Sequence, residues 1–169
     1  NQNFLFFDKL KNNDFKLIYL LGADNFNFEK ENKFIVYQGS HGDKGAEIAD
    51  IILPGAAYTE KNGMFVNLEG KLQNAYKASY PPGDSREDWI IFKDLANMMK
   101  KPLGFTNEKN LRELIKKQIE SKINRNVNTN SVNFIEGNIF IKPIDYYYTN
   151  PIARSSKVMS ECRQIEKNF

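Results

Sequence analysis

The chain has 169 residues, of which 41% are apolar and 27% charged, and such a composition is typical of one globular domain with its own core. Its formal net charge of +3 is too small for a nucleic-acid-binding surface, and no apolar run approaches the ~18 residues of a membrane helix. With one cysteine, Cys162, and one histidine, His41, the chain falls far short of a zinc or iron–sulfur ligand set. We therefore expect no nucleic-acid partner, no membrane span and no metal site in it.

Short apolar runs near the start predict buried strands, each closed by turn-forming residues: 15–21, 34–37 and 49–53. Because these runs are continuous rather than alternating, they indicate a mostly parallel sheet. Residues 25–33 are too few for an ordinary crossover helix, so we expect compact crossovers or elements outside this chain. Further on, residues 64–68 and 71–73 flank Glu69-Gly70 and predict a β-hairpin.

Residues 81–83, Pro-Pro-Gly, break the chain, and a helix is predicted to begin directly after them. The signal is a pair of overlapping capping boxes, Asp84 with Glu87 and Ser85 with Asp88. An apolar stripe at helical spacing predicts that this helix packs into the core; its members are Trp89, Phe92, Leu95, Ala96 and Met99.

The rest of the chain predicts a surface helix, a polar loop and an aromatic tail. Residues 108–123 carry a thin apolar stripe, and residues 124–138 are polar and aperiodic, which predicts a variable loop. Residues 139–169 predict an extended tail with a short amphipathic helix. Because exposed aromatic residues lower solubility, we expect this tail to pack on the domain or on a neighbouring chain.

The glycine-rich segment Gly39–Gly45 follows a predicted strand, as phosphate-binding loops do. Its spacing matches neither of the common phosphate-binding motifs, so we favour a tight structural connection over a phosphate site. Ser40 and His41 are adjacent and point apart, which argues against a nucleophile and its base. We interpret His41 as a hydrogen-bonded structural residue and Cys162 as an apolar helix contact.

The acidic residues offer no catalytic pair that the sequence can define. Their mutual distances do not follow from the sequence for Asp43, Asp50, Glu60 and Glu69. We therefore predict no catalytic, no cofactor-binding and no metal-binding residue in this chain.

A long motif nevertheless resembles a known superfamily. Residues 46–63 contain Ala-Asp-Ile-Ile-Leu-Pro and Glu-Lys-Asn-Gly, and residues 66–73 contain Asn-Leu-Glu-Gly-Lys-Leu-Gln. Together they resemble the signature of molybdopterin oxidoreductases. More narrowly, several stretches are similar to the largest iron–sulfur subunit of respiratory complex I, with a C-terminal motif found in mitochondrial and alphaproteobacterial forms; these stretches are residues 20–24, 36–67, 81–89 and 145–162.

This resemblance implies the C-terminal portion of a molybdopterin-oxidoreductase-like α/β domain, similar to those of formate dehydrogenase and DMSO reductase. It implies a partial domain without cofactor over residues 1–123, the variable loop over 124–138 and the tail over 139–169. The iron–sulfur clusters are then expected in an N-terminal part missing from this chain or in partner subunits. Since the chain starts at Asn1 rather than methionine, we expect a trimmed chain or a fragment.

The implied function is structural, with no catalytic residues of its own, in the peripheral arm of complex I. The implied partners are the N-terminal iron–sulfur part of the same subunit and the flavin- and iron–sulfur-carrying subunits of that arm. The implied location is the matrix side of the mitochondrial inner membrane, and the AT-rich codon bias suggested by many asparagines and lysines fits a gene on the mitochondrial genome.

The resemblance also implies roles for individual residues. Glu60, Asn67, Glu69 and Gly70 would shape the region between sheet and hairpin, whereas Tyr146–Tyr148 and Arg154 would belong to a tail that clamps a neighbour. Lys71 stands where the signature usually has arginine, which keeps the charge but loses the bidentate guanidinium.

Two alternatives stay open. One is a fragment of a true molybdopterin enzyme such as formate dehydrogenase, with Gly39–Gly45 near a pterin pyrophosphate. The other is a free-standing module that binds a small molecule.

Overall fold

The computed structural model describes residues 15–23, 30–42, 44–123, 137 and 145–166. Its centre is a three-stranded parallel sheet in the order β1-β2-β3. The strands are β1 (Leu17–Leu21), β2 (Phe34–Gly39) and β3 (Ile51–Pro54). The α/β class, the parallel sheet and all three predicted strands are confirmed.

The core lies on one face of this sheet, between β1, β2 and the short helix α2 (Lys44–Glu47). Because side chains alternate along a strand, β1 and β2 bury one set of residues there, namely Ile18, Leu20, Ile35 and Tyr37. The opposite face is partly covered by helix α3 (Asp88–Met98): Val36 and Gln38 are buried there, and the Tyr19 ring contacts Phe92. Other apolar side chains on this face are between 44% and 60% exposed: Leu17, Leu21, Phe34 and Ile51. Parallel sheets are normally covered on both faces, so within the described residues the cover of this second face is incomplete.

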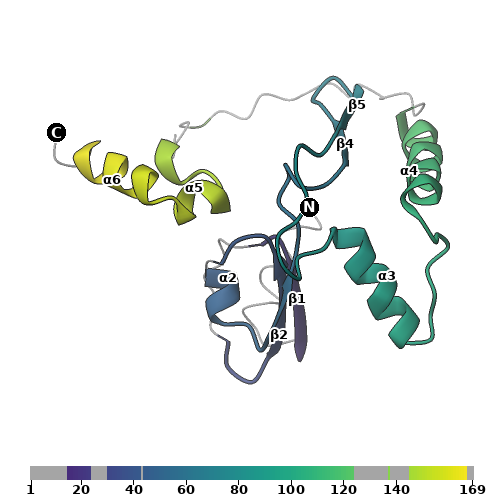
Figure 1. The fold of residues 1–169 in the computed structure, drawn as a ribbon, viewed down its shortest axis with the longest axis horizontal. Coiled ribbons are helices and arrows are strands. Elements are labelled where there is room, and N and C mark those ends of the chain that lie inside the picture. Colours follow the sequence, from purple (N-terminus) through teal and green to yellow (C-terminus); the bar gives the residue numbers. More distant parts are fainter. Residues whose placement is uncertain (1–14, 24–29, 43, 124–136, 138–144, 167–169) are drawn as a thin grey trace.

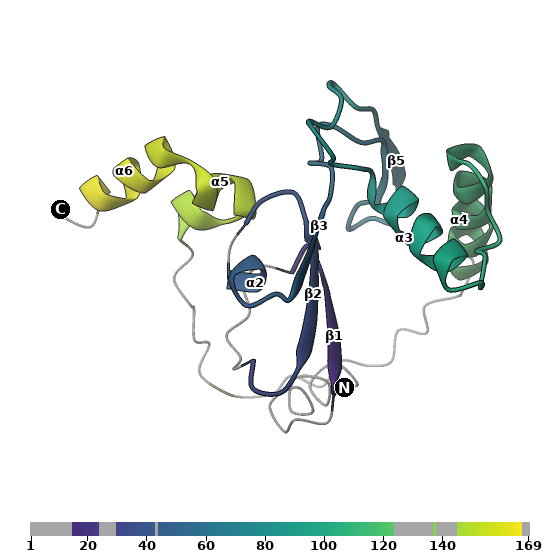
Figure 2. The same ribbon diagram turned by 60° about the horizontal axis from the view of Figure 1, so that its bottom comes forward.

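The predicted hairpin is confirmed as β4 (Gly63–Val66) and β5 (Leu72–Ala75), paired antiparallel with Phe65 opposite Gln73. It stands apart from the three-stranded sheet, beyond the carboxyl end of β3 (Figures 1 and 2). The hairpin and the parallel sheet are separate sheets.

Helix α3 spans Asp88–Met98 and begins later than the capping boxes predict. Residue 86 is extended instead, because its carbonyl accepts a hydrogen bond from Ala56 N–H at 2.8 Å and its N–H donates to Pro54 O at 3.1 Å. Glu87 is the N-cap residue but makes no side-chain cap. The predicted capping boxes are therefore wrong, since pairing beside β3 holds this segment.

The predicted second helix is confirmed as α4 (Glu108–Ile123). The predicted variable loop, apart from Gly137, lies outside the described residues, as do residues 139–144 of the tail and Asp43.

Over residues 145–166 the tail is helical rather than extended. It forms the short helices η1 (Tyr146–Tyr148), α5 (Pro151–Ser155) and α6 (Lys157–Glu166), of which α6 is the predicted amphipathic helix. Asn150 caps α5 by accepting the Ala153 N–H at 2.9 Å, and Pro151 occupies the first turn. In both ribbon views α5 and α6 lie on the side of the sheet that faces α2 (Figure 1).

Candidate functional site

The glycine loop after β2 is built around the side chain of Tyr37, which is 2% exposed. The Tyr37 hydroxyl donates to the carbonyl of His41 at 2.6 Å, inside the loop. A Cβ on Gly39 would overlap the Tyr37 hydroxyl, and one on Gly45 would lie 3.0 Å from the Tyr37 ring and 2.8 Å from Ala23 O. The glycines therefore leave room for a tyrosine ring in the interior of the loop.

The prediction that Ser40 and His41 point apart is wrong, because their side chains contact each other at the surface. His41 Nδ1 lies 3.0 Å from Ser40 Oγ, and Ser40 is exposed. Within the described part of the chain, no carboxylate or thiol orients this imidazole, so the geometry provides no third group of the kind that catalysis needs. This fits the structural interpretation of the histidine.

Asp50 fixes the start of β3 against β2. Its Oδ2 accepts the Ile35 N–H at 2.8 Å, while its own N–H donates to Ile35 O at 2.8 Å. Lys30 pairs with Asp50 Oδ1 at 2.6 Å. The hydrogen bonds from Lys30 and from the Ile35 backbone hold the pKa of Asp50 below its ordinary value. The aspartate of the Ala-Asp-Ile-Ile motif thus holds two strands in register.

The carboxylate of Asp88, the first residue of α3, joins two other segments of the chain. Asp88 Oδ1 accepts a hydrogen bond from Gln38 Nε2 at 2.8 Å, and Asp88 Oδ2 pairs with Lys61. Gln38 is fully buried, and its Oε1 accepts a hydrogen bond from the Tyr19 hydroxyl. Burial, together with the nearby Asp88 charge, raises the pKa of Tyr19.

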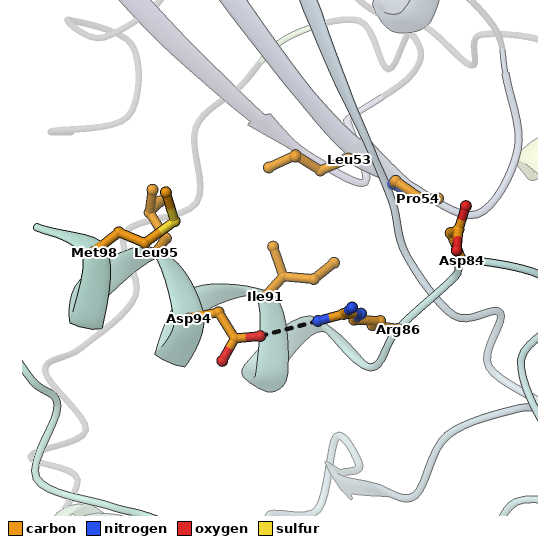
Figure 3. Close-up of a pocket in the computed structure, with 8 residues that line it drawn as sticks. All are labelled: Leu53, Pro54, Asp84, Arg86, Ile91, Asp94, Leu95 and Met98. Carbon is orange, nitrogen blue, oxygen red and sulfur yellow. Dashed lines mark hydrogen bonds and ion pairs between the residues drawn. The ribbon is translucent and has the colours of Figure 1, made fainter.

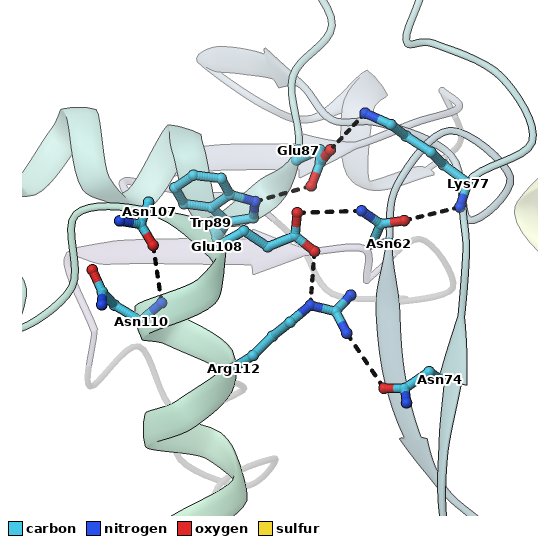
Figure 4. Close-up of polar contacts among 9 residues, drawn as sticks. All are labelled: Asn62, Asn74, Lys77, Glu87, Trp89, Asn107, Glu108, Asn110 and Arg112. Carbon is cyan, nitrogen blue, oxygen red and sulfur yellow. Dashed lines mark hydrogen bonds and ion pairs between the residues drawn. The ribbon is translucent and has the colours of Figure 1, made fainter.

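The side-chain amide of Asn62, the residue after Lys61, forms hydrogen bonds to α4 and to the chain just after β5 (Figure 4). Its Nδ2 donates to Glu108 Oε2 at 3.2 Å, and its Oδ1 accepts the Lys77 N–H at 3.0 Å. Glu108 Oε1 in turn accepts from Arg112 Nε at 2.7 Å, and Arg112 Nη1 donates to Asn74 Oδ1 at 3.3 Å. The first turn of α4 is thereby joined to the hairpin.

A further carboxylate, that of Glu87, contacts both the first turn of α3 and Lys77, which follows β5. It accepts from Trp89 Nε1 at 2.9 Å and lies 3.6 Å from Lys77 Nζ (Figure 4). Glu60, at the start of the same Glu-Lys-Asn-Gly motif, accepts the Ala57 N–H at 3.0 Å. We call residues 60–63 the joint, because they connect the parallel sheet, the hairpin, α3 and α4.

The hairpin turn depends on Asn67 and Gly70, as the sequence predicts. Asn67 Oδ1 accepts the N–H groups of Glu69 and Lys71 at 3.1 and 2.8 Å. Gly70 has a φ of 81°, in the left-handed region that favours glycine. Glu69 contributes a weak contact to Asn67 Nδ2 at 3.3 Å, and Lys71 is exposed. These four residues form a turn and show no convergence on a common ligand.

Two apolar cavities flank α3. One, of about 290 Å³, lies between α3 and the end of β3 and has the Arg86–Asp94 ion pair, at 3.1 Å, among its lining residues (Figure 3). The other, of about 550 Å³, is an open groove lined by apolar side chains, among them Trp89, Phe92, Leu95, Ala96, Met99, Leu103, Phe105 and Leu111. The predicted core stripe therefore borders an open groove, and no residue of α3 is fully buried.

The first cavity has three charged side chains in its lining, Asp84, Arg86 and Asp94, and the last two are paired with each other. Among the described residues, no group of three or more His, Cys, Asp or Glu side chains is placed to hold a metal ion. No described helix is both long enough and apolar enough to cross a membrane. The sequence analysis did not identify Gln38 or Glu108 as part of this network, and it named Asp88 only in a capping box and Lys61 and Asn62 only within the family motif.

In the tail, Tyr148 makes local contacts to Ser160, Arg154 and Arg163, whereas Tyr146 is largely exposed. Tyr148 donates to Ser160 Oγ at 3.0 Å, Arg154 Nη1 donates to Tyr148 O at 3.3 Å, and Arg163 lies 4.4 Å above the Tyr148 ring. Arg163 also pairs with Asp145 at 2.5 Å. Cys162 is a free, half-buried thiol on α6.

Comparison with known proteins gives two family matches. Residues 2–98 match the molybdopterin oxidoreductase family, and residues 116–162 match a family of C-terminal regions from one NADH-ubiquinone oxidoreductase component, the G subunit.

Individual relatives agree with these matches. The chain is 44% identical over 163 residues to the NADH-ubiquinone oxidoreductase 75 kDa subunit of Reclinomonas americana, covering 89% of this chain and 23% of the relative. It is 41% identical over 167 residues to the corresponding NADH-quinone oxidoreductase component of Rickettsia felis, covering 94% and 25%. It is 40% identical over 168 residues to the mitochondrial 78 kDa subunit of NADH-ubiquinone oxidoreductase from Candida albicans, covering 87% and 23%.

The chain thus spans about a quarter of the length of these relatives. The resemblance that the sequence motifs indicated is confirmed, and the match over residues 2–98 includes the parallel sheet, the joint, the hairpin and α3. The chain belongs to the molybdopterin oxidoreductase family.

Proposed function

We propose that this chain is a non-catalytic structural part of the peripheral, matrix-side arm of complex I, at the mitochondrial inner membrane. The observation that carries the proposal is its similarity to components of NADH-ubiquinone and NADH-quinone oxidoreductases, over about nine tenths of its length. This similarity favours complex I over a formate dehydrogenase fragment. The expected partners are the cluster-carrying N-terminal part of the same subunit and the flavin- and iron–sulfur-carrying subunits.

The use of the signature residues supports a structural role. Lys61 forms an ion pair with Asp88, and Asn62 donates a hydrogen bond to Glu108. Asp50 forms an ion pair with Lys30 and accepts a hydrogen bond from the Ile35 N–H. Each of these polar groups therefore stabilises a connection between elements. An active site requires polar groups that can contact a substrate, whereas Lys61, Asn62 and Asp50 form their bonds to other residues of the chain.

The glycine loop does not fit a molybdopterin pyrophosphate in its interior. A pyrophosphate-binding loop presents free backbone N–H groups around an open space. Here the Tyr37 ring fills that space, and the Gly55 N–H, which lies beside the loop, donates to Gly39 O at 2.9 Å. We therefore propose that this chain binds neither pterin nor molybdenum, nor any iron–sulfur cluster.

The incomplete cover of one sheet face, within the described residues, supports a partner from the same protein or assembly. Leu17, Leu21, Phe34 and Ile51 stay largely exposed on that face, and a stable α/β sheet buries such side chains.

The test is isolation of the native assembly through a tag on this chain. Mass spectrometry would identify the co-purifying proteins, and NADH:quinone oxidoreductase activity would be assayed on the same sample. The proposal predicts flavin- and iron–sulfur-carrying subunits and NADH oxidation. A monomeric chain, or an assembly without NADH activity, would overturn it.

A further inference from the structure

The first residues of the three parallel strands form an apolar patch at the amino end of the sheet. They are Leu17 of β1, Phe34 of β2 and Ile51 of β3, each at least 44% exposed. Leu17 is paired with Phe34, and Ile51 is paired with Val36, which lies two residues after Phe34. Because paired residues of a parallel sheet, and residues two apart along a strand, point to the same face, the three side chains share one face. We call them the amino-end patch.

Helix α3 covers the other end of this face. The ring centroids of Tyr19 and Phe92 are 5.6 Å apart, and Gln38 donates to Asp88 at 2.8 Å. Leu53 lines the cavity beside α3 (Figure 3). Tyr19, Gln38 and Leu53 each lie two or more residues further along their strands than the patch residues. Among the described residues, α3 therefore leaves the amino end of the face to solvent.

The chain enters the sheet beside this patch. The carbonyl of Lys16, directly before β1, accepts the Phe34 N–H at 2.8 Å. The sequence just before this point is rich in apolar residues, namely Phe4, Leu5, Phe6, Phe7 and Leu10. Residues 11–16 separate this apolar stretch from β1 and can span about 20 Å, whereas three adjacent strands are about 10 Å across. The stretch can therefore reach the whole patch.

Two observations favour this stretch over the other parts of the chain that the structure does not describe. The molybdopterin oxidoreductase match begins at residue 2, so the stretch belongs to the family domain together with the sheet. The tail, which follows residues 138–144, lies on the α2 side of the sheet (Figures 1 and 2), and Ala23, which precedes residues 24–29, packs against the core on that side. Residues 124–136 are mainly polar.

We propose that residues 4–10 cover the amino-end patch. A parallel sheet is stable when both of its faces are buried, and this stretch supplies the apolar side chains that α3 does not. Of the two sources of cover considered above, the same protein or its assembly, the inference commits to the same chain. It goes beyond the proposed function, because it holds in any assembly, and it implies that partner subunits bind the chain at other surfaces.

Photocrosslinking from the patch tests this contact. A benzophenone amino acid replaces Phe34 in the full chain, the protein is irradiated, and cross-linked peptides are identified by mass spectrometry. Cross-links to residues 1–14 are expected. The same probe in place of Leu68, on the exposed hairpin turn, is the control and should not reach those residues. Cross-links from position 34 to residues 124–144, to another polypeptide or to no protein at all would overturn the inference, as would equal cross-linking from both positions.

Solvent access to the patch provides a quantitative test. Ile51→Cys, in a Cys162→Ser background, is labelled with a maleimide reagent. Replacing residues 4–7 by serine should raise the labelling rate by about fivefold or more, because the thiol loses its cover. Replacing the polar residues 11–14 by serine is the matched control and should leave the rate unchanged. Equal rates in the two variants would contradict the inference. The cross-linking experiment keeps residues 1–14 unaltered and decides the question where the first variant does not fold.

Discussion

The buried amide of Gln38 donates a hydrogen bond to the carboxylate of Asp88 across 2.8 Å, linking the carboxyl end of β2 to the first residue of α3. The residues are 50 positions apart, and Lys61 approaches the same carboxylate from the joint. Three segments of the chain therefore meet at one group. This arrangement explains how a polar signature motif can serve the fold rather than a reaction.

Removing this carboxylate should destabilise the chain. Asp88→Ala leaves the Gln38 amide buried without its acceptor, which should lower the free energy of unfolding by about 1–3 kcal/mol. Asp94→Ala, on the same helix, breaks only the exposed ion pair with Arg86 and should cost less than about 1 kcal/mol. Urea unfolding followed by circular dichroism measures both. Equal losses would argue against a special role for Asp88.

The Tyr37 packing predicts a difference between two glycines of one loop. Gly39→Ala places a methyl group against the Tyr37 hydroxyl and ring, and such overpacking should cost about 1–3 kcal/mol. Gly42→Ala has just the Ala46 methyl at 3.8 Å and should change stability by less than about 0.5 kcal/mol. Thermal unfolding of the two variants checks this. A stable Gly39→Ala protein would mean that the loop interior is open.

Asp50 predicts a pH dependence of stability. Its pKa is lowered in the folded state by Lys30 and by the Ile35 N–H, so the folded chain binds this proton less tightly than the unfolded chain does. Its stabilising contribution is therefore present above the unfolded pKa of about 3.9 and is lost as the pH falls through the lower folded value. Asp50→Asn should flatten the acid limb of stability against pH. Asp84→Asn, which changes an exposed carboxylate, is the control. If the free energy of unfolding falls with decreasing pH identically in wild type and in Asp50→Asn, Asp50 does not cause this pH dependence.

The hairpin turn predicts a further glycine contrast. Gly70 has a φ of 81°, and placing alanine in that region should cost roughly 1–2 kcal/mol. Gly104 has no neighbouring atom within 4 Å of its Cβ position and no left-handed φ, so Gly104→Ala should be neutral. Hydrogen exchange of the hairpin amides, compared between the two variants, reports the effect locally. Unchanged exchange in Gly70→Ala would show that the turn is not held as described.

Local signals predicted most of the regular structure. The apolar runs closed by turn residues indicated the parallel strands, the Glu69-Gly70 turn indicated the hairpin, and the stripe over 108–123 predicted α4 with the same bounds. The tail was the exception. Its aromatic residues suggested an extended chain, although Asn150 followed by Pro151 is a helix-start signal that could have indicated α5.

The contacts of the joint could not be predicted, because they link residues far apart in the sequence. Lys61 and Asp88 are 27 positions apart, and Asn62 and Glu108 are 46 apart. The same limit explains the misplaced start of α3, where pairing of Arg86 with residues 54–56 overrides two good capping boxes. The core stripe of α3 was expected to be buried, but in the described residues the groove beside it remains open.

The measurement that tests the central claim most directly is the molybdenum and pterin content of the NADH-oxidising assembly that contains this chain. Metal analysis and pterin fluorescence would be normalised to the amount of the chain. A structural role, with Tyr37 filling the glycine loop, predicts an active assembly with neither molybdenum nor pterin. One molybdenum and one pterin cofactor per chain would contradict the account and make the loop a cofactor site.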